Sequence, residues 1–302
     1  MKILMTYHKP VLLDESIKGL NIKPNGIYVD VTFGGGGHSK EILKKLENGF
    51  LYGFDQDIDA INNTIESDNF KLIRSNFRFV KNFLKLEGVQ KIDGLIADLG
   101  ISSFQIDVPE RGFAHRFENS IDMRMNSDAD LDASEILNSY SEKEIARVLY
   151  EYGDIKQSRK IAQKIVKYRF DNKIETTSQL KDILSAFYPK KIENKFLSKF
   201  FQALRIEVND EINALKDLLN DVVDLMNNKA RLVVISYHSL EDKLIKNLIT
   251  KGNVDGIDEN DFFGNRKLQL TPINKKVIVP TDFECNVNSR ARSAKLRIAE
   301  KI

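Results

Sequence analysis

Three scarcities narrow the class of protein. The 302-residue chain has one cysteine, Cys285, so it holds no internal disulfide framework and no cysteine-based zinc cluster. No apolar run approaches the ~18 residues of a membrane-spanning helix, and the N-terminal apolar residues are too few for a signal peptide. Glycine is absent between Gly153 and Gly252, whereas twelve of the sixteen glycines lie in residues 1–112. We expect a cytoplasmic protein with no membrane partner and two differently built regions.

Charge is nearly balanced overall, at +2, but it is unevenly distributed. Residues 118–154 carry ten acidic and three basic side chains, whereas residues 156–205 carry thirteen basic and four acidic ones. Residues 262–302 carry nine basic and three acidic ones. Basic blocks of this kind indicate a polyanionic partner, but solvated helix faces explain the same charge equally well.

The first part of the chain alternates short buried-strand patterns with helical ones. Strands are expected at 27–31, 50–54, 70–73 and 94–97, and helices at 39–47, at 58–65 and through Phe79, Phe83 and Leu86. Alternation of this kind produces right-handed βαβ units and a parallel sheet. The fold class predicted is therefore doubly wound α/β.

The β pattern disappears between about residues 115 and 226. Helices are predicted there by capping boxes and amphipathic spacing, at Ser141/Glu144, Thr176/Gln179, 160–170 and 196–226. A buried strand returns at 231–236 and precedes a helix at 240–249, and the tail offers candidate strands at 276–279 and 294–299.

One topology accounts for this order. We predict an α/β domain formed by residues 1–112 and 216–302, interrupted by an inserted all-helical domain at 113–215. Two sequential domains are the alternative, but the strand at 231–236 would then lack a sheet.

The ends of the predicted strands hold the candidate cofactor residues, because ligands of doubly wound sheets bind beyond these ends. Four glycines, Gly34–Gly37, follow the first strand and allow close backbone approach. The strict dinucleotide fingerprint lacks its third glycine, which is replaced by Ser39, and the P-loop pattern is absent. Asp55 ends the second strand, where it can accept hydrogen bonds from a ribose diol. The glycine loop together with Asp55 is typical of a site for NAD or for S-adenosylmethionine. Alternatively, the glycines form only a tight turn and Asp55 only caps a helix, with no ligand bound.

Asp98 ends the fourth strand, directly before Leu99 and Gly100. An acid at this position would face the reactive end of the cofactor. In amine-methylating enzymes, this strand end orients an NH2 group toward the sulfonium methyl. A capping role for Asp98 is the alternative.

Eight segments, in order over nearly the whole chain, give a more specific signal. Together they resemble the bacterial family that methylates the N4 amine of a cytidine in small-subunit (16S) ribosomal RNA. The segments are Tyr7–Leu13, Thr32–Ser39, Asp98–Gln105, Arg111–Phe113, Asp122–Met125, Ser198–Arg205, Ser236–Asp242 and Arg290–Arg297.

The resemblance implies a Rossmann-like class I methyltransferase sheet with a helical insert, and S-adenosylmethionine as the cofactor. Gly36, Gly37 and His38 would hold its methionyl end, with Gly35 in the same site. Asp55 would take the ribose, Phe77 would lie near the adenine, and Asp98 and Gln105 would complete the pocket.

The resemblance also implies the substrate, a cytidine in the decoding region of 16S rRNA within the small ribosomal subunit. We expect Arg111, His238, Ser239, Arg290 and Arg292 to contact it. Whether the protein acts as a monomer or a homodimer stays open. Aromatic residues near the strand ends are candidates to receive a flipped base, namely Phe104, Phe113, Phe117 and Tyr237.

The chemistry expected is direct methylation of an amine. Methylation at cytosine C5 needs a cysteine nucleophile, and Cys285 lies near the C-terminus without a preceding proline. We assign Asp98, with Ser102, to orienting the amine, and identify no general base. The histidine spacings match no metal-binding pattern, so we expect no metal. A dehydrogenase and a non-catalytic ribosome-assembly factor are the rival functions.

Overall fold

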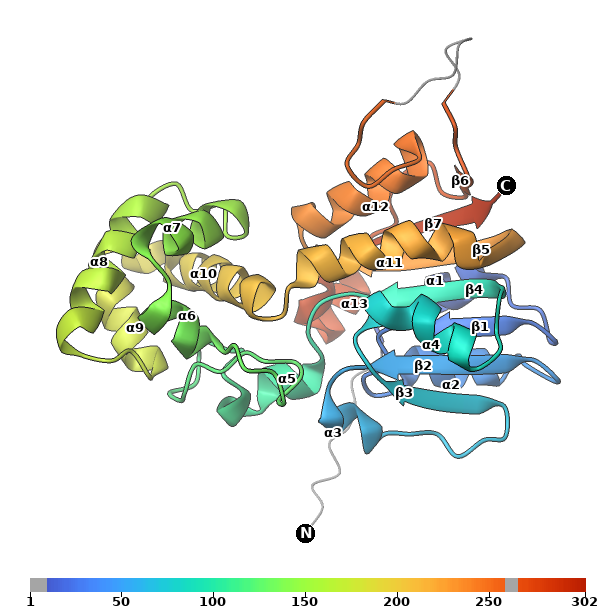
Figure 1. Cartoon of the computed structure of the whole chain (residues 1–302), viewed down its shortest axis with the longest axis horizontal. Coiled ribbons are helices and arrows are strands. Elements are labelled where there is room, and N and C mark those ends of the chain that lie inside the picture. The colour runs from blue at the N-terminus through green and yellow to red at the C-terminus, as the bar shows by residue number, and fades with distance from the viewer. Residues whose placement is uncertain (1–9, 259–265) are drawn as a thin grey trace. The chain divides into compact units, whose positions relative to one another are not determined.

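The computed structural model of the chain describes residues 10–258 and 266–302 (Figure 1). The chain divides into two compact units, Met1–Gly100 with Ile212–Ile302, and Ile101–Glu211. The sequence predicts these limits at 112/113 and 215/216. Ile101 packs against the core of the second unit, and Leu215 is buried in the core of the first, so both lie on the other side of the predicted limits.

The first unit is built on a seven-stranded sheet in the order β3-β2-β1-β4-β5-β7-β6 (Figure 1). Strands β1 to β5 pair in parallel, and β7 runs antiparallel to both β5 and β6. This confirms the doubly wound, Rossmann-like α/β class. The strands are β1 (Ile27–Asp30), β2 (Phe50–Asp55), β3 (Phe70–Arg74), β4 (Ile92–Asp98), β5 (Met226–Ser236), β6 (Leu270–Pro272) and β7 (Lys295–Lys301).

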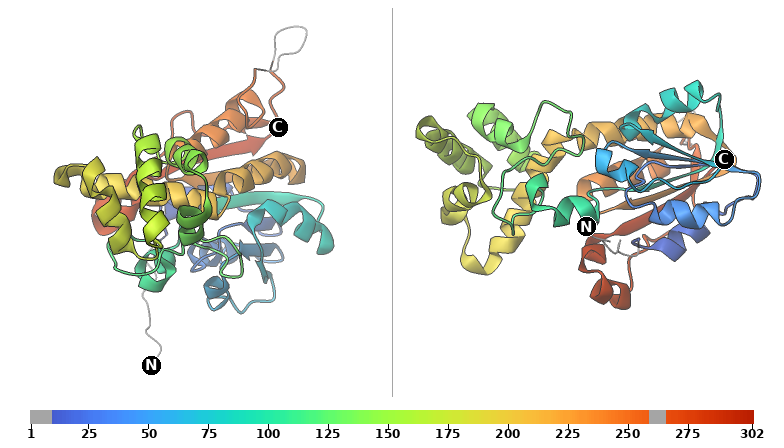
Figure 2. Two further views of the ribbon diagram at one scale, coloured as in Figure 1. Left: turned by 60° about the vertical axis from the view of Figure 1, so that its left-hand side comes forward. Right: turned by 90° about the horizontal axis from the view of Figure 1, so that it is seen from below.

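Helices cover both faces of this sheet, as the right-hand view of Figure 2 shows. Alternate side chains of a strand point to opposite faces, so Val29 packs with α4, α11 and α12, whereas its neighbour Tyr28 packs with α1 and α2. Burial on both faces explains the continuous apolar run Leu232–Ile235 in β5. The helices of this unit are α1 (Leu13–Leu20), α2 (Gly37–Leu43), α3 (Ile58–Ile61), α4 (Val80–Leu86), α11 (Glu211–Leu225), α12 (Ser239–Lys251) and α13 (Asp282–Val287), with short 3-10 helices η1 (Phe77–Phe79) and η5 (Ser289–Ser293).

The expected strand at 276–279 is wrong. Ile278 makes only an isolated bridge with Leu296, and the strand beside β7 is β6 instead. The reason lies in the hydrogen bonding of β7, because the side chain of Asn274 accepts the hydrogen bond of the Ile298 amide (2.8 Å). That amide is then lost to any strand that would continue the ladder.

The second unit is helical, and its only β pairing is one isolated bridge between Ser120 and Thr176. Both predicted capping boxes are confirmed: the hydroxyls of Ser141 and Thr176 accept the amides of Glu144 and Gln179. The helices are α5 (Ser103–Asp107), α6 (Ala133–Ser139), α7 (Glu142–Glu151), α8 (Ser158–Asp171), α9 (Thr177–Leu184) and α10 (Glu193–Val208), with 3-10 helices η2 (Pro109–Arg111), η3 (Ser185–Phe187) and η4 (Lys190–Ile192).

The amphipathic segment 196–226 is two helices rather than one. Asp210, between α10 and α11, has φ 48°, a left-handed conformation that does not continue a right-handed helix. The side chain of Asn209 accepts the Met125 amide (2.7 Å) and donates to the Met123 carbonyl (2.8 Å). These bonds tie the break to the loop before α6.

Within residues 10–258 and 266–302, no helix has the length and apolar character needed to cross a membrane. His8, with the start of the Tyr7–Leu13 segment, lies outside the described residues, as do residues 262–265 of the C-terminal basic block.

Candidate active site

The strand order changes direction at the carboxyl ends of β1 and β4. The connection from β1 leads to β2 on one side, and β4 pairs on the other side of β1. This is the topological switch point, where open α/β sheets bind their ligands. Three strands end there in an acid, namely Asp30, Asp55 and Asp98.

Asp30, which was not among the predicted site residues, anchors the glycine loop. Its carboxylate accepts hydrogen bonds from the Thr32 amide (3.1 Å) and the Ser39 hydroxyl (2.7 Å). Burial raises the pKa of Asp30 to about 6, and these hydrogen bonds oppose the shift. The sequence held a signal for it, because Asp30 ends a buried strand directly before the loop, as Asp98 does before Gly100.

The glycines shape a close-fitting cradle. Gly34 and Gly36 have φ of 51° and 71°, the region that favours glycine. A Cβ on Gly36 would lie 2.9 Å from the Phe33 ring, and one on Gly37 would lie 2.1 Å from Pro10. The loop therefore excludes side chains at these positions and exposes its backbone. Gly35 lies between Gly34 and Gly36 in the same loop.

Asp55 is tied to the same loop. Its carboxylate accepts the Gly34 amide (2.8 Å) and the Asp57 amide (2.9 Å) through different oxygens. Burial raises its pKa to about 6, and these hydrogen bonds oppose the shift. A carboxylate has about four acceptor positions, so capacity remains for hydroxyl groups of a ligand. Phe77 lies in η1, soon after β3, and packs partly buried against the sheet.

Asp98 is held from two sides. Its amide donates to the Thr32 hydroxyl (2.7 Å), and its Oδ1 accepts the Tyr237 hydroxyl (2.7 Å). Oδ2 lies 4.0 Å from Nδ1 of His38, too far for a hydrogen bond. Within the described residues no donor is bonded to Oδ2, and 23% of the side chain stays exposed.

The electrostatics of Asp98 suit proton chemistry. Burial raises the pKa of its carboxyl group to about 7, with the Tyr237 hydrogen bond opposing and the charges of Asp30 and Glu241 assisting. Burial also lowers the pKa of His38 to about 4, so this ring is neutral at pH 7. Asp98 is therefore the group of this pair that titrates near neutrality.

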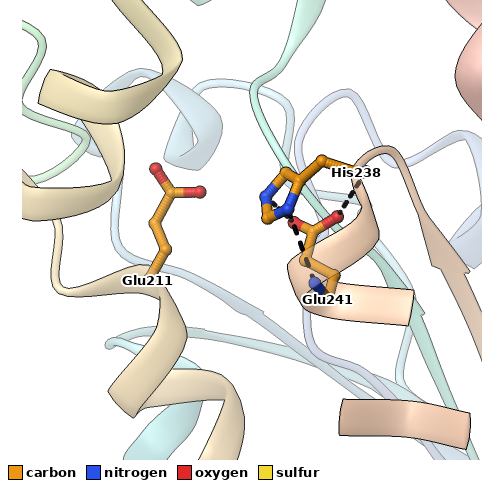
Figure 3. Close-up of side chains that lie close together, drawn as sticks. All are labelled: Glu211, His238 and Glu241. Atoms are coloured by element: carbon orange, nitrogen blue, oxygen red, sulfur yellow. Dashed lines mark hydrogen bonds and ion pairs between the residues drawn. The ribbon is translucent and has the colours of Figure 1, made fainter. Parts of the chain in front are cut away.

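The turn from β5 into α12 presents His238 and Ser239. His238 caps α12: its Nδ1 accepts the Glu241 amide (3.4 Å), and its Nε2 lies 3.1 Å from Oε1 of Glu241 (Figure 3). The buried Glu241 carboxylate accepts the Tyr237 amide (2.8 Å) in return. Ser239 is exposed at the first turn of α12. Glu211, also drawn, belongs to the second unit, where its carboxylate pairs with Arg205.

Three predicted site residues belong to the second unit. The side chains of Ser102 and Gln105 form a capping box at the start of α5, and Gln105 is buried. Arg111 donates to the carbonyls of Arg124 (2.9 Å) and Met125 (3.3 Å). These contacts hold local structure.

Phe113, one of the candidate rings for a flipped base, is buried in the core of the second unit. It is therefore a packing residue.

The C-terminal cations differ in their surroundings. Arg290 and Arg292 lie in η5, and Arg292 is exposed. Arg297 forms a two-bond pair with Asp242 (2.7 and 3.2 Å), and Lys295 lies 3.7 Å from the same carboxylate. Arg297 and Lys295 thus fasten β7 to α12.

The first unit is a Rossmann-like domain whose glycine loop and strand-end acids lie at the sheet edge where such folds bind their ligands. The chain belongs to the MraW methylase family, whose family model matches residues 5–302. This confirms the resemblance and the class of enzyme, a methyltransferase.

Relatives of similar length support the assignment. A protein of Parabacteroides distasonis named ribosomal RNA small subunit methyltransferase H is 53% identical over 298 residues, 98% of each chain. A protein of Flavobacterium johnsoniae with the same name is 50% identical over 303 residues, 100% of each chain. Among solved structures, an rRNA methylase from Streptococcus thermophilus is 11% identical, with TM-score 0.43 over 96% of this chain and 93% of that one. At these values the solved structure adds nothing to the family assignment.

Proposed function

We propose that the chain transfers a methyl group from S-adenosylmethionine to the N4 amine of a cytidine in 16S rRNA. The observation that carries the proposal is membership of the MraW methylase family over residues 5–302. The names of the full-length relatives supply the small-subunit rRNA as substrate. The decoding region as the target and the cytoplasm as the location follow from the same resemblance.

The cradle at the end of β1 suits the cofactor. Gly35, Gly36, Gly37 and His38 would hold the methionyl end, where a Cβ on Gly36 or Gly37 would collide with Phe33 or Pro10. Asp55 would accept the ribose hydroxyls with its remaining acceptor positions, and Phe77 would lie near the adenine. When bound, the cofactor supplies an electrophilic methyl group on a sulfonium.

Asp98 would orient the amine. Tyr237 occupies Oδ1, which leaves Oδ2 to accept a hydrogen bond from the amine and to align its lone pair with the methyl group. A carboxyl group with pKa near 7 can also take the proton that the alkylated nitrogen releases. Ser102 would assist Asp98 in orienting the amine, and Gln105 would complete the cofactor pocket, as the resemblance implies. Both side chains also form the capping box of α5.

Arg111, His238, Ser239, Arg290 and Arg292 would contact the rRNA, and all five lie within the segments that carry the resemblance. His238 and Ser239 directly follow Tyr237, the residue that bonds Asp98, in the turn from β5 into α12. Sedimentation equilibrium of the protein alone distinguishes a monomer of 34.6 kDa from a homodimer.

Tritiated methyl transfer to undermethylated small ribosomal subunits tests the function. Label at N4 of a single cytidine supports the proposal, and binding without transfer would instead identify an assembly factor. Thermal stabilisation by S-adenosylhomocysteine but not by NADH separates the enzyme from a dehydrogenase.

A further inference from the structure

Helix α8 presents a row of cations on one face. Its buried side chains, Ser158, Ile161, Ala162 and Ile165, pack into the core of the second unit. At 3.6 residues per turn, the four cations occupy an arc of about 140° opposite that buried side. All four are exposed, and they are Arg159, Lys160, Lys164 and Lys167.

These cations have no carboxylate partner among residues 10–258 and 266–302, in contrast to other cations of the same unit. The paired ones include Arg147 with Glu207 (2.6 Å), Arg205 with Glu211 (2.8 Å) and Lys199 with Asp154 (2.9 Å). The α8 row therefore keeps its full positive field for a ligand from outside the chain.

An aromatic ring completes the row. Phe170, in the last turn of α8, is 89% exposed and falls within the same arc, and the row ends at Asp171. Exposing a whole phenyl ring loses the free energy of burying it, about 1.5–3 kcal/mol. By contrast, the exposed Lys190 and Lys191 lie in the 3-10 helix η4 and Lys195 lies in α10, so these three lysines do not share one helix face with such a ring.

We propose that this α8 face, formed by the four cations and Phe170, binds a single-stranded segment of the 16S rRNA substrate. The inference rests on the proposed function. Lysine and arginine neutralise backbone phosphates, and an exposed ring stacks on a base that is not paired in a duplex. The rRNA is the polyanion that the proposed function supplies, and it offers both phosphates for the cations and unpaired bases on which the ring can stack.

The first test changes the charge. A variant with Arg159→Gln, Lys160→Gln, Lys164→Gln and Lys167→Gln is compared with a control that neutralises four exposed lysines of the first unit, Lys18, Lys45, Lys85 and Lys246. Affinity for a 16S rRNA fragment spanning the decoding region is measured against salt concentration. The α8 variant is expected to flatten the log–log slope by about 0.7 for each phosphate that is no longer neutralised, whereas the control leaves the slope unchanged. Equal slopes for both variants would overturn the proposal.

The second test changes the ring. Phe170→Ala is expected to weaken binding at least about 5-fold without changing the salt slope, and Phe170→Tyr is expected to restore it. Both variants should keep the thermal stability and the S-adenosylhomocysteine affinity of the parent, because these side chains are exposed. Full binding by Phe170→Ala would refute the stacking.

The outcomes separate this inference from the function itself. If the parent methylates small subunits and the α8 variants bind the RNA as tightly as the parent does, the inference about the α8 face fails and the proposed function stands. If the parent transfers no methyl group, the proposed function fails. A loss of binding to whole subunits but not to bare RNA would assign the face to a ribosomal protein and overturn the proposal.

Discussion

Replacing Asp98 by Asn tests the chemistry at the strand edge with the smallest change of shape. The Asn side chain keeps an oxygen that can accept the Tyr237 hydroxyl (2.7 Å in the parent). Its amide nitrogen takes the place of Oδ2, so a donor faces the target amine where an acceptor stood. The variant is therefore expected to fold like the parent but to lose the hydrogen bond that orients the target amine.

The expected loss follows from one charge-assisted hydrogen bond. Such a bond contributes about 1.5–3 kcal/mol, and each factor of ten in rate corresponds to about 1.4 kcal/mol. Turnover is therefore expected to fall by about 10- to 150-fold. Because burial raises the pKa of Asp98 to about 7, parent turnover should rise with pH through that value as the carboxylate forms. The Asn variant has no such group, so its profile should be flat there.

The assay is tritiated methyl transfer at saturating S-adenosylmethionine, because Asp98 also borders the predicted cofactor site. Tyr237→Phe is the matched control: it keeps the carboxylate but removes a hydrogen bond that lowers the pKa. It should retain more turnover than the Asn variant, with the midpoint moved to higher pH. Near-parental turnover and an unchanged pH profile for Asp98→Asn would refute the reasoning.

Three further predictions concern the cofactor, the RNA and the fold. Asp55→Ala should weaken S-adenosylmethionine binding at least about 10-fold by calorimetry, because ribose hydrogen bonds to a charged acceptor are removed; unchanged affinity in a folded variant would remove Asp55 from the site. Neutralising Arg290 and Arg292 together should flatten the salt dependence of RNA binding while cofactor affinity stays intact, and equal slopes would make this tail structural. The pKa of Asp30 is raised from 3.8 to about 6 in the fold, so its contribution to the free energy of unfolding is present at low pH and is lost, by about 2–3 kcal/mol, as pH rises from about 4 to about 7. Urea unfolding of Asp30→Asn should show about 2–3 kcal/mol less pH dependence over this range than the parent, while the dependence from Asp55 and Asp98 remains, and an equal dependence in both proteins would contradict the assignment.

Local pattern singled out the residues of the proposed cofactor site. The glycine loop needs glycine because Gly34 and Gly36 have positive φ and because a Cβ on Gly37 would collide with Pro10. Asp55 and Asp98 were predicted because parallel strands bring their carboxyl ends to one edge. The partners of these acids were not predictable, since Tyr237 reaches Asp98 from 139 residues away in the sequence.

The sequence by itself determined the class of fold and the family. Strand and helix periodicities are local, so they identified the parallel sheet, the helical insert and the capping boxes at Ser141 and Thr176 without knowledge of neighbours. Only the tertiary structure decided the order of the strands, the break of the long helix at Asp210 and the replacement of the strand at 276–279 by β6. Each of these depends on which backbone groups find hydrogen-bond partners far away in the chain, as when Asn274 takes the amide of Ile298. Hydrophobic period does not carry that information, because it records which face of an element is buried and not what it is buried against.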